Sequence, residues 1–285
     1  MSKIYYENAA GKIVEFDGQN IRVRESDLRD YEWDYTLISN PSGRGGRVGK
    51  FSRSSAEKTL SIQIRGKSRE ECNAALNALH AVTEADIQSK TPGRLWLDGQ
   101  YLTCYCAMGS EMSDWHAGYH YLKKDLKILV VYPFWLTEKT QEFLPGRTES
   151  SAYGKKYNNR YPYQYGTGYA NQILFNDHYA PTPAIITFYG PCASPQIYIA
   201  NHLYGLDGAS ADTGERIVID QLTQIPSQKV YKVGLDGQIT NLFDQRVKTS
   251  SPFEYIPIGD VRVQYTGEFG FQIKLIQMRS EPKWI

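Results

Sequence analysis

The stretch Leu126-Lys127-Ile128-Leu129-Val130-Val131-Tyr132-Pro133-Phe134-Trp135-Leu136 decides how this chain divides. It begins as a strand-like apolar run and ends in a Pro beside two large aromatic residues, directly before a change in composition. Nothing around it has the residues of a catalytic loop. The stretch predicts a packed domain hinge at Pro133, Phe134 and Trp135, which joins a helix-containing β-domain to a second β-rich domain.

Length and composition are those of an ordinary soluble globular protein. The chain has 285 residues, enough for one large or two medium domains, with 41% hydrophobic and 22% charged residues. A net charge of +1 gives no global field to attract nucleic acid or an anionic membrane. The N-terminus lacks an apolar signal core and no apolar run is long enough to span a membrane, so we expect maturation in the cytoplasm and no membrane insertion.

The first domain is expected over residues 1–136, and its sequence pattern predicts a β-sheet. The segment Asp98-Gly99 separates two apolar runs and is a strong signal for a tight hairpin. Residues 31–38 alternate aromatic and acidic side chains before turning apolar, which predicts a half-buried strand. Further strands are expected at residues 4–6, 13–16, 59–65, 95–97, 101–106 and 121–132.

One helix is expected over residues 69–85. Ser68 and Glu71 form a capping box, in which the Ser hydroxyl accepts from the N–H of the residue three positions on. Four apolar residues then recur at helical spacing and make one narrow stripe, as for a helix lying on a sheet: Cys72, Leu76, Leu79 and Val82.

A Gly-rich basic loop is expected over residues 40–55. No acidic residue occurs from position 35 to position 56. Such a loop costs too much conformational entropy to order alone, so we expect it to order on a neighbouring subunit, an adjacent ring or a polyanion. A solvated loop is the alternative. The segment lacks the Gly-Lys-Ser/Thr ending of a phosphate-binding loop. Its candidate contact residues are Gly43, Arg44, Gly45, Gly46, Arg47, Lys50 and Arg53.

A Tyr-rich segment follows the hinge, and residues 137–180 are expected to form a linker or arm. Gly, Asn, Lys and Pro separate the tyrosines, and neither a helical nor a strand period holds. An arm that clasps a neighbour is the favoured interpretation. Single-stranded nucleic acid is an alternative, but no basic groove accompanies the tyrosines, so we expect no specific nucleic-acid binding. The expected arm contacts are Tyr153, Tyr157, Tyr161, Tyr163 and Tyr165.

Residues 181–285 alternate short strand-like runs with Gly, Pro, Asp and Asn, which is typical of a β-sandwich. The fold class is therefore mainly β with one helix in the N-terminal domain.

No motif for catalysis, metal binding or cofactor binding is present. His116 and His120 are four residues apart, but Gly118 lies between them and no Glu follows the first His, so the zinc-protease pattern is absent. Cys104 and Cys106 point to one face of a strand without two further ligands, and we expect buried, reduced thiols. An acid–base pair among the scattered carboxylates stays open. We predict no catalytic residue, no metal and no cofactor.

The order of these features resembles the distal tail protein family of long-tailed phages and phage-tail-like particles (tailocins). The similarity spans nearly the whole chain, and the order of the motifs is more specific than any one of them. They are the strand meander, the Gly-rich loop, Ile62-Gln63-Ile64-Arg65-Gly66-Lys67-Ser68-Arg69-Glu70-Glu71, Pro92-Gly93-Arg94-Leu95-Trp96-Leu97-Asp98-Gly99-Gln100-Tyr101-Leu102, Tyr132-Pro133-Phe134-Trp135, Val261-Arg262-Val263 and Arg279-Ser280-Glu281-Pro282-Lys283-Trp284.

This resemblance implies a structural virion protein and not an enzyme. It implies a homo-hexameric ring that joins the tail tube to the baseplate or tip. The N-terminal domain would be tail-tube-like and form the ring. The C-terminal domain would be a galectin-like β-sandwich that faces outward and can carry a receptor-binding protein. Expected partners are further copies, the tail tube protein and tail tip, hub or baseplate proteins, with assembly in the bacterial cytoplasm. The Tyr-rich segment departs from the compact family core.

Two other functions stay open. A carbohydrate-binding module would use the C-terminal sandwich, with exposed aromatic rings as stacking platforms. A tail-associated cell-wall hydrolase would need one essential carboxylate. Ring formation is physically reasonable because edge strands pair readily and Tyr and Trp suit interfaces.

Overall fold

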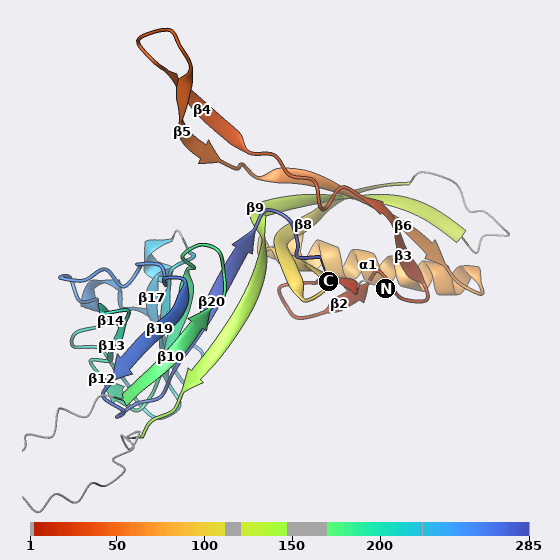
Figure 1. The fold of residues 1–285 in the computed structure, drawn as a ribbon. Helices are drawn as coiled ribbons and strands as arrows, with labels where there is room; N and C mark the ends of the chain where they lie inside the picture. Colours follow the sequence, from red (N-terminus) through yellow and green to blue (C-terminus); the bar gives the residue numbers. More distant parts are fainter. Residues whose placement is uncertain (1–2, 112–120, 147–169, 224, 285) are drawn as a thin grey trace, which may run out of the picture. The chain divides into compact units, whose positions relative to one another are not determined.

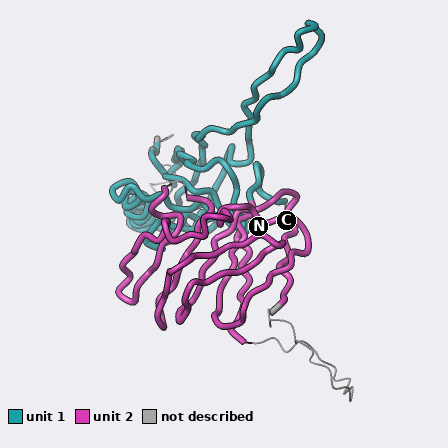
Figure 2. The backbone as a smooth tube through the Cα atoms, turned by 90° about the vertical axis from the view of Figure 1, so that its left-hand side faces the viewer, with its two compact units in different colours: residues 1–137, 278–285 teal, residues 138–277 magenta. Residues whose placement is uncertain are grey.

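The computed structural model describes residues 3–111, 121–146, 170–223 and 225–284, which are mostly β-strand with one α-helix. Two compact units divide the chain (Figure 2). Unit 1 consists of residues 1–137 and 278–285, and unit 2 of residues 138–277. The chain leaves unit 1 within one strand and returns to it within another. No local sequence pattern predicts this return of the last residues to unit 1.

Unit 1 is built on antiparallel strands with a helix (Figure 1). One run of paired strands has the order β2-β1-β7-β8-β9, and β9 also pairs with β6, which pairs with β3. The strand bounds are β1 Ile4–Glu7, β2 Ile13–Glu15, β3 Ile21–Ser26, β6 Ala56–Arg65, β7 Gly93–Leu97, β8 Gln100–Glu111 and β9 Tyr121–Phe143.

The β7–β8 hairpin confirms the predicted turn at Asp98-Gly99. Both residues have positive φ, 49° and 79°, the conformation that a tight two-residue hairpin requires. The core of unit 1 takes its apolar residues from these strands and from the helix, among them the fully buried Tyr6, Phe16, Leu60 and Trp135.

Helix α1 spans Arg69–Ser89. Its N-terminus is as predicted, because the N–H of Glu71 donates to the Ser68 hydroxyl (3.3 Å) and the Glu71 carboxylate accepts from the N–H of Lys67 (2.7 Å). The expected end near position 85 is wrong. The helix continues through Asp86, whose buried carboxylate accepts hydrogen bonds from Tyr6 and Ala9 of the β1–β2 region. The last helical residue is Ser89, and Lys90 caps the helix in the left-handed conformation, with a φ of 55°.

Strand β9 is longer than predicted, and the expectation that it ends at the Pro-aromatic motif is wrong. Pro133 and Trp135 are buried within the strand, which continues to Phe143. The pairing with β8 shifts register there: Thr103 is opposite Tyr132, whereas Tyr101 is opposite Leu136. An irregularity of this kind accommodates a Pro, because it leaves local positions without a ladder hydrogen bond.

The described part of unit 2 contains two main antiparallel sheets, as expected for a β-sandwich. One has the strand order β18-β17-β16-β11-β20, and the other has the order β10-β19-β13-β14. Buried residues of both contribute to one hydrophobic core, with Phe188 and Phe271 from the first and Ile197 and Val263 from the second. The bounds are β10 Ala170–Asn176, β11 Ala184–Tyr189, β13 Gln196–Ile199, β14 His202–Gly205, β16 Arg216–Asp220, β17 Val230–Val233, β18 Ile239–Asn241, β19 Gly259–Tyr265 and β20 Phe271–Arg279.

Short elements complete unit 2. Strands β12 (Cys192–Ala193) and β15 (Ser210–Ala211) pair with each other, and two 3₁₀ turns lie at Pro226–Gln228 and Phe243–Gln245. The galectin-like character expected for this sandwich stays a prediction.

Candidate interaction surface

The segment expected to be a Gly-rich loop is a β-hairpin that projects from the rest of unit 1 (Figure 1). Strand β4 spans Asp34–Ser39 and strand β5 spans Gly46–Ser52, and among the described strands they pair only with each other. The strand predicted at residues 31–38 is present as β4, but its predicted half-buried character is wrong, because every residue of β4 is exposed. An alternating pattern indicates a strand with two different faces, but it cannot show whether the apolar face is covered within the same chain.

The two faces of this hairpin differ in chemistry. Tyr35 lies opposite Phe51, and Leu37 lies opposite Val48. Cross-strand partners share a face, and so do residues two apart, so these four side chains form one apolar face. Their exposed fractions are 61% for Tyr35, 58% for Phe51, 62% for Leu37 and 44% for Val48.

The opposite face carries the positive charge. Thr36 lies opposite Lys50, and Ile38 lies opposite Arg47. The register shifts between Thr36 and Leu37, next to Gly49, where a Cβ atom would lie only 2.8 Å from the Ile38 side chain. Arg44, also predicted as a contact, lies in the turn between the two strands. Gly43 and Gly45, on either side of it, have positive φ of 69° and 68°. The predicted basic residues are therefore brought together on an exposed ribbon.

At the base of the hairpin, the predicted basic contact residues and the predicted hinge residues meet. The guanidinium carbon of Arg53 lies 5.0 Å from the ring centroid of Phe134 in β9 and 5.6 Å from that of Trp33. Trp33 also contacts Phe51 and Phe134, at centroid distances of 6.3 Å and 5.9 Å. Burial lowers the pKa of Arg53. The Arg53 guanidinium, held among these aromatic rings, fixes the base of the hairpin against β9.

The three residues predicted as a hinge lie together in β9, on the unit 1 side of the boundary that follows Thr137. Trp135 is 1% exposed and belongs to the core of unit 1. Tyr132, just before them, donates a hydrogen bond from its hydroxyl to the Met278 sulfur at 2.8 Å. Their role as a hinge stays a prediction. The five arm tyrosines lie within residues 147–169, outside the described residues.

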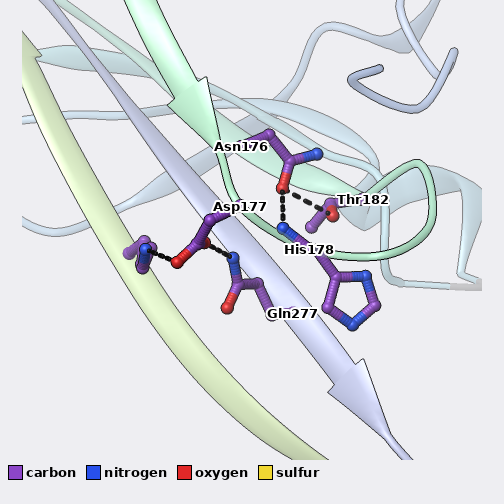
Figure 3. A network of polar contacts seen from close by, with 6 residues as sticks. Asn176, Asp177, His178, Thr182 and Gln277 are labelled. Atoms are coloured by element: carbon purple, nitrogen blue, oxygen red, sulfur yellow. Dashed lines mark hydrogen bonds and ion pairs between the residues drawn. The ribbon is translucent and has the colours of Figure 1, made fainter. Parts of the chain in front are cut away.

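A polar network in unit 2 holds the segment after β10 (Figure 3). Asp177 accepts a hydrogen bond from Gln277 (2.6 Å) and pairs with Lys139 (2.5 Å). These contacts lower the pKa of the Asp177 carboxyl, with Lys139 the largest cause. The buried Asn176 amide donates to the carbonyls of Ile256 and Pro257. The network anchors the loop that follows β10.

The cysteines have the environment of structural thiols. Cys104 and Cys106 are buried and free, as the sequence predicted. Burial raises the pKa of the Cys106 thiol to about 11 and raises the pKa of Cys104 further from its usual range. Such thiols are poor nucleophiles. No cluster of three metal-ligating side chains occurs among the described residues, and His116 and His120 lie outside them. Nor does the described part of the chain contain a helix suited to cross a bilayer.

Comparison with known proteins identifies the architecture. No protein-family model and no curated protein matches the chain. Among solved structures, the SPP1 Dit protein, from a hub adsorption apparatus of phages that infect Gram-positive bacteria, superimposes with a TM-score of 0.60 at 12% identity, over 98% of this chain and 99% of that chain.

A chain of the phage P2 baseplate in its activated conformation with calcium superimposes with a TM-score of 0.62 at 13% identity, over 99% of this chain and 100% of the other. The same baseplate with strontium gives a TM-score of 0.61 at 12% identity, over 99% and 100%. Because these matches cover both chains end to end, the whole order of elements is shared and not only one sheet. The chain therefore has a Dit-like fold, the fold of the SPP1 Dit protein and of a phage P2 baseplate chain.

Proposed function

We propose that the protein is a structural, non-enzymatic component of a phage tail or phage-tail-like particle. Copies of the chain form a hexameric ring that joins the tail tube to the baseplate or tip. The observation that carries the proposal is the β4–β5 hairpin, whose apolar face is exposed among the described residues. The Dit-like fold supports the same role.

The physical argument begins with the stability of the hairpin. A lone two-stranded ribbon is marginally stable in water, and a continuous exposed apolar face marks an interaction site. Tyr35, Leu37, Val48 and Phe51 form such a face. The hairpin extends away from its own sheets, so a further chain must cover it. In a closed ring every copy offers the same hairpin and the same acceptor surface, so each apolar face is buried in turn.

The basic face then serves a second contact. Arg47 and Lys50 lie opposite the apolar face, and Arg44 lies at the tip. When the apolar face packs against a neighbour within the ring, these cations are left to face the adjacent ring or the lumen. The tail tube protein is the proposed partner for this side, whereas tip, hub or receptor-binding proteins attach to unit 2. The Tyr-rich arm and the β9 hinge belong to the same proposal.

The oligomeric state of the purified full-length chain tests this proposal. We expect native mass spectrometry to give six copies and negative-stain images to show a six-fold ring. Leu37→Asp places a charge in the apolar face and should give monomers whose circular dichroism spectrum is unchanged. Thr36→Asp, on the opposite face of the same strand, should leave the ring intact.

A wild-type chain that stays monomeric at every concentration overturns the ring. Saturable binding on a glycan array by such a monomer would favour the carbohydrate-binding alternative. Degradation of cell-wall material, lost on changing a single carboxylate, would favour the hydrolase.

A further inference from the structure

A second candidate binding site lies in unit 1, at a cavity of about 280 Å³ that the ring proposal does not use. Strands β1, β3 and β7 and the segments that follow β2 and β3 line it. Its apolar wall consists of Ile4, Phe16, Val23, Leu28 and Leu97, and its polar residues are Asp17, Arg22, Ser26 and Arg29. The volume lies near the lower end of the range for ligand pockets, roughly 300 Å³. It is sized for one bulky side chain with its flanking groups.

Arg29 gives the cavity a specific chemistry. Its Nη1 atom is buried and has no hydrogen-bond partner among the described residues. The guanidinium carbon lies 3.8 Å from the ring centroid of Trp284, so stacking fixes the plane of the group. A buried donor without a partner is costly, and a guanidinium pairs best with a carboxylate. The cavity therefore combines an apolar wall with the guanidinium of Arg29, which has one donor without a partner among the described residues.

The charges around the cavity favour an acidic occupant. Two arginines, Arg22 and Arg29, line it against one carboxylate, Asp17. The β4–β5 hairpin of another copy fits this requirement poorly, because its one acidic residue, Asp34, is the first residue of β4 at the base of the hairpin, and residues 35–56 contain neither Asp nor Glu. The occupant therefore differs from the element that is proposed to close the ring.

We propose that this cavity binds a peptide segment of a partner protein that presents an aliphatic side chain next to a carboxylate. The aliphatic group fills the space between Phe16, Val23 and Leu28, and the carboxylate accepts from Arg29. The two interactions act together, since a desolvated charge-assisted hydrogen bond is worth more than an exposed one.

The test uses the full-length protein and three probes, with binding followed by saturation-transfer NMR of the probe. The first probe is the capped peptide acetyl-Gly-Asp-Leu-Asp-Gly-amide. The second is the matched peptide with Asn in place of both Asp residues, and the third is decanoate, a free carboxylate with an aliphatic chain. We expect the acidic peptide to bind at least about tenfold more tightly than its Asn counterpart.

Variants locate the binding. Arg29→Gln should remove the preference for the acidic peptide, and Ser26→Phe should fill the cavity and abolish binding. Lys12→Gln removes one exposed charge elsewhere in unit 1 and should change nothing. Equal binding of the two peptides, no binding of either, or an unaltered preference in Arg29→Gln overturns the proposal. Saturable binding of decanoate without binding of the peptide also overturns it, in favour of a fatty-acid site. Ring formation in Arg29→Gln is measured separately, so failure here leaves the ring proposal standing.

Discussion

The guanidinium carbon of Arg53, at the end of the projecting hairpin, lies 5.0 Å from the ring centroid of Phe134 in the middle of β9. These residues are far apart in the sequence and belong to two sites that were inferred separately. Their contact shows that the basic hairpin and the Pro-aromatic motif form one structural element.

Changing Arg53 to Ala should loosen the base of the hairpin without unfolding unit 1. A cation–π contact contributes about 0.5 to 2 kcal/mol, and the core residue Trp135 is not touched by the change. We expect faster amide hydrogen exchange in β4 and β5 and unchanged exchange in α1. Arg44→Ala, at the hairpin turn, is the matched control and should leave exchange at the base as it is. Protection of β4 that survives the loss of Arg53 would contradict the anchoring role.

Deleting residues 43–50 should leave the unit 1 fold intact and block stacking on the next ring, and because it removes Val48 from the apolar face it should also weaken ring closure. The deletion removes the turn and most of β5 but none of the buried core residues. Electron microscopy of tail-like assemblies, together with the thermal unfolding curve of the deleted protein, checks both parts. Normal assembly of the deletion variant would refute the contact role of the hairpin.

Tyr6→Phe should destabilise unit 1 by about 1 to 3 kcal/mol, because it leaves a buried acceptor with one partner fewer. The Tyr6 hydroxyl donates to Asp86 Oδ2 at 2.6 Å, and Asp86 is 1% exposed. Urea unfolding followed by circular dichroism measures the change. Tyr5→Phe is the matched control, because the Tyr5 ring stacks on Trp96, at a centroid distance of 5.7 Å, and keeps that contact. Equal stability of the two variants would show that the Asp86 contact does not matter.

The Asp177 network should make a small, pH-dependent contribution to the stability of unit 2. Lys139 and Gln277 lower the pKa of Asp177 in the folded state, so the contribution is present above the unfolded pKa. It is lost as the pH falls through the lowered pKa. Both side chains of the ion pair are 42% exposed, so solvent screening limits the effect to about 1 kcal/mol or less.

Asp177→Asn should lower stability at neutral pH and make no difference once the carboxyl is protonated. Urea unfolding of the variant and the wild type across that acidic range gives the comparison. A stability difference that persists unchanged at the acid end would assign the effect to the side-chain shape and not to its charge.

The local features were predictable because neighbouring residues determine them. The capping box at Ser68 and Glu71 specifies a helix start whatever the tertiary surroundings, and Asp98-Gly99 supplies the positive φ of a tight turn. Strands of unit 2 were recognised from short apolar runs between turn residues. The helix end was missed because Tyr6 and Ala9, distant in the sequence, hold Asp86 in the last turns.

By itself, the sequence determined that the chain is mainly β with one helix, that its two cysteines in β8 are buried thiols and that its basic residues cluster around glycines. Only the tertiary structure decided that those glycines belong to a ribbon with one apolar face and one basic face. The physical reason is that a strand pattern specifies which side chains share a face, whereas burial depends on what lies opposite that face. Among the described residues, Tyr35, Leu37, Val48 and Phe51 stay exposed, although Trp33 packs against the ring of Phe51.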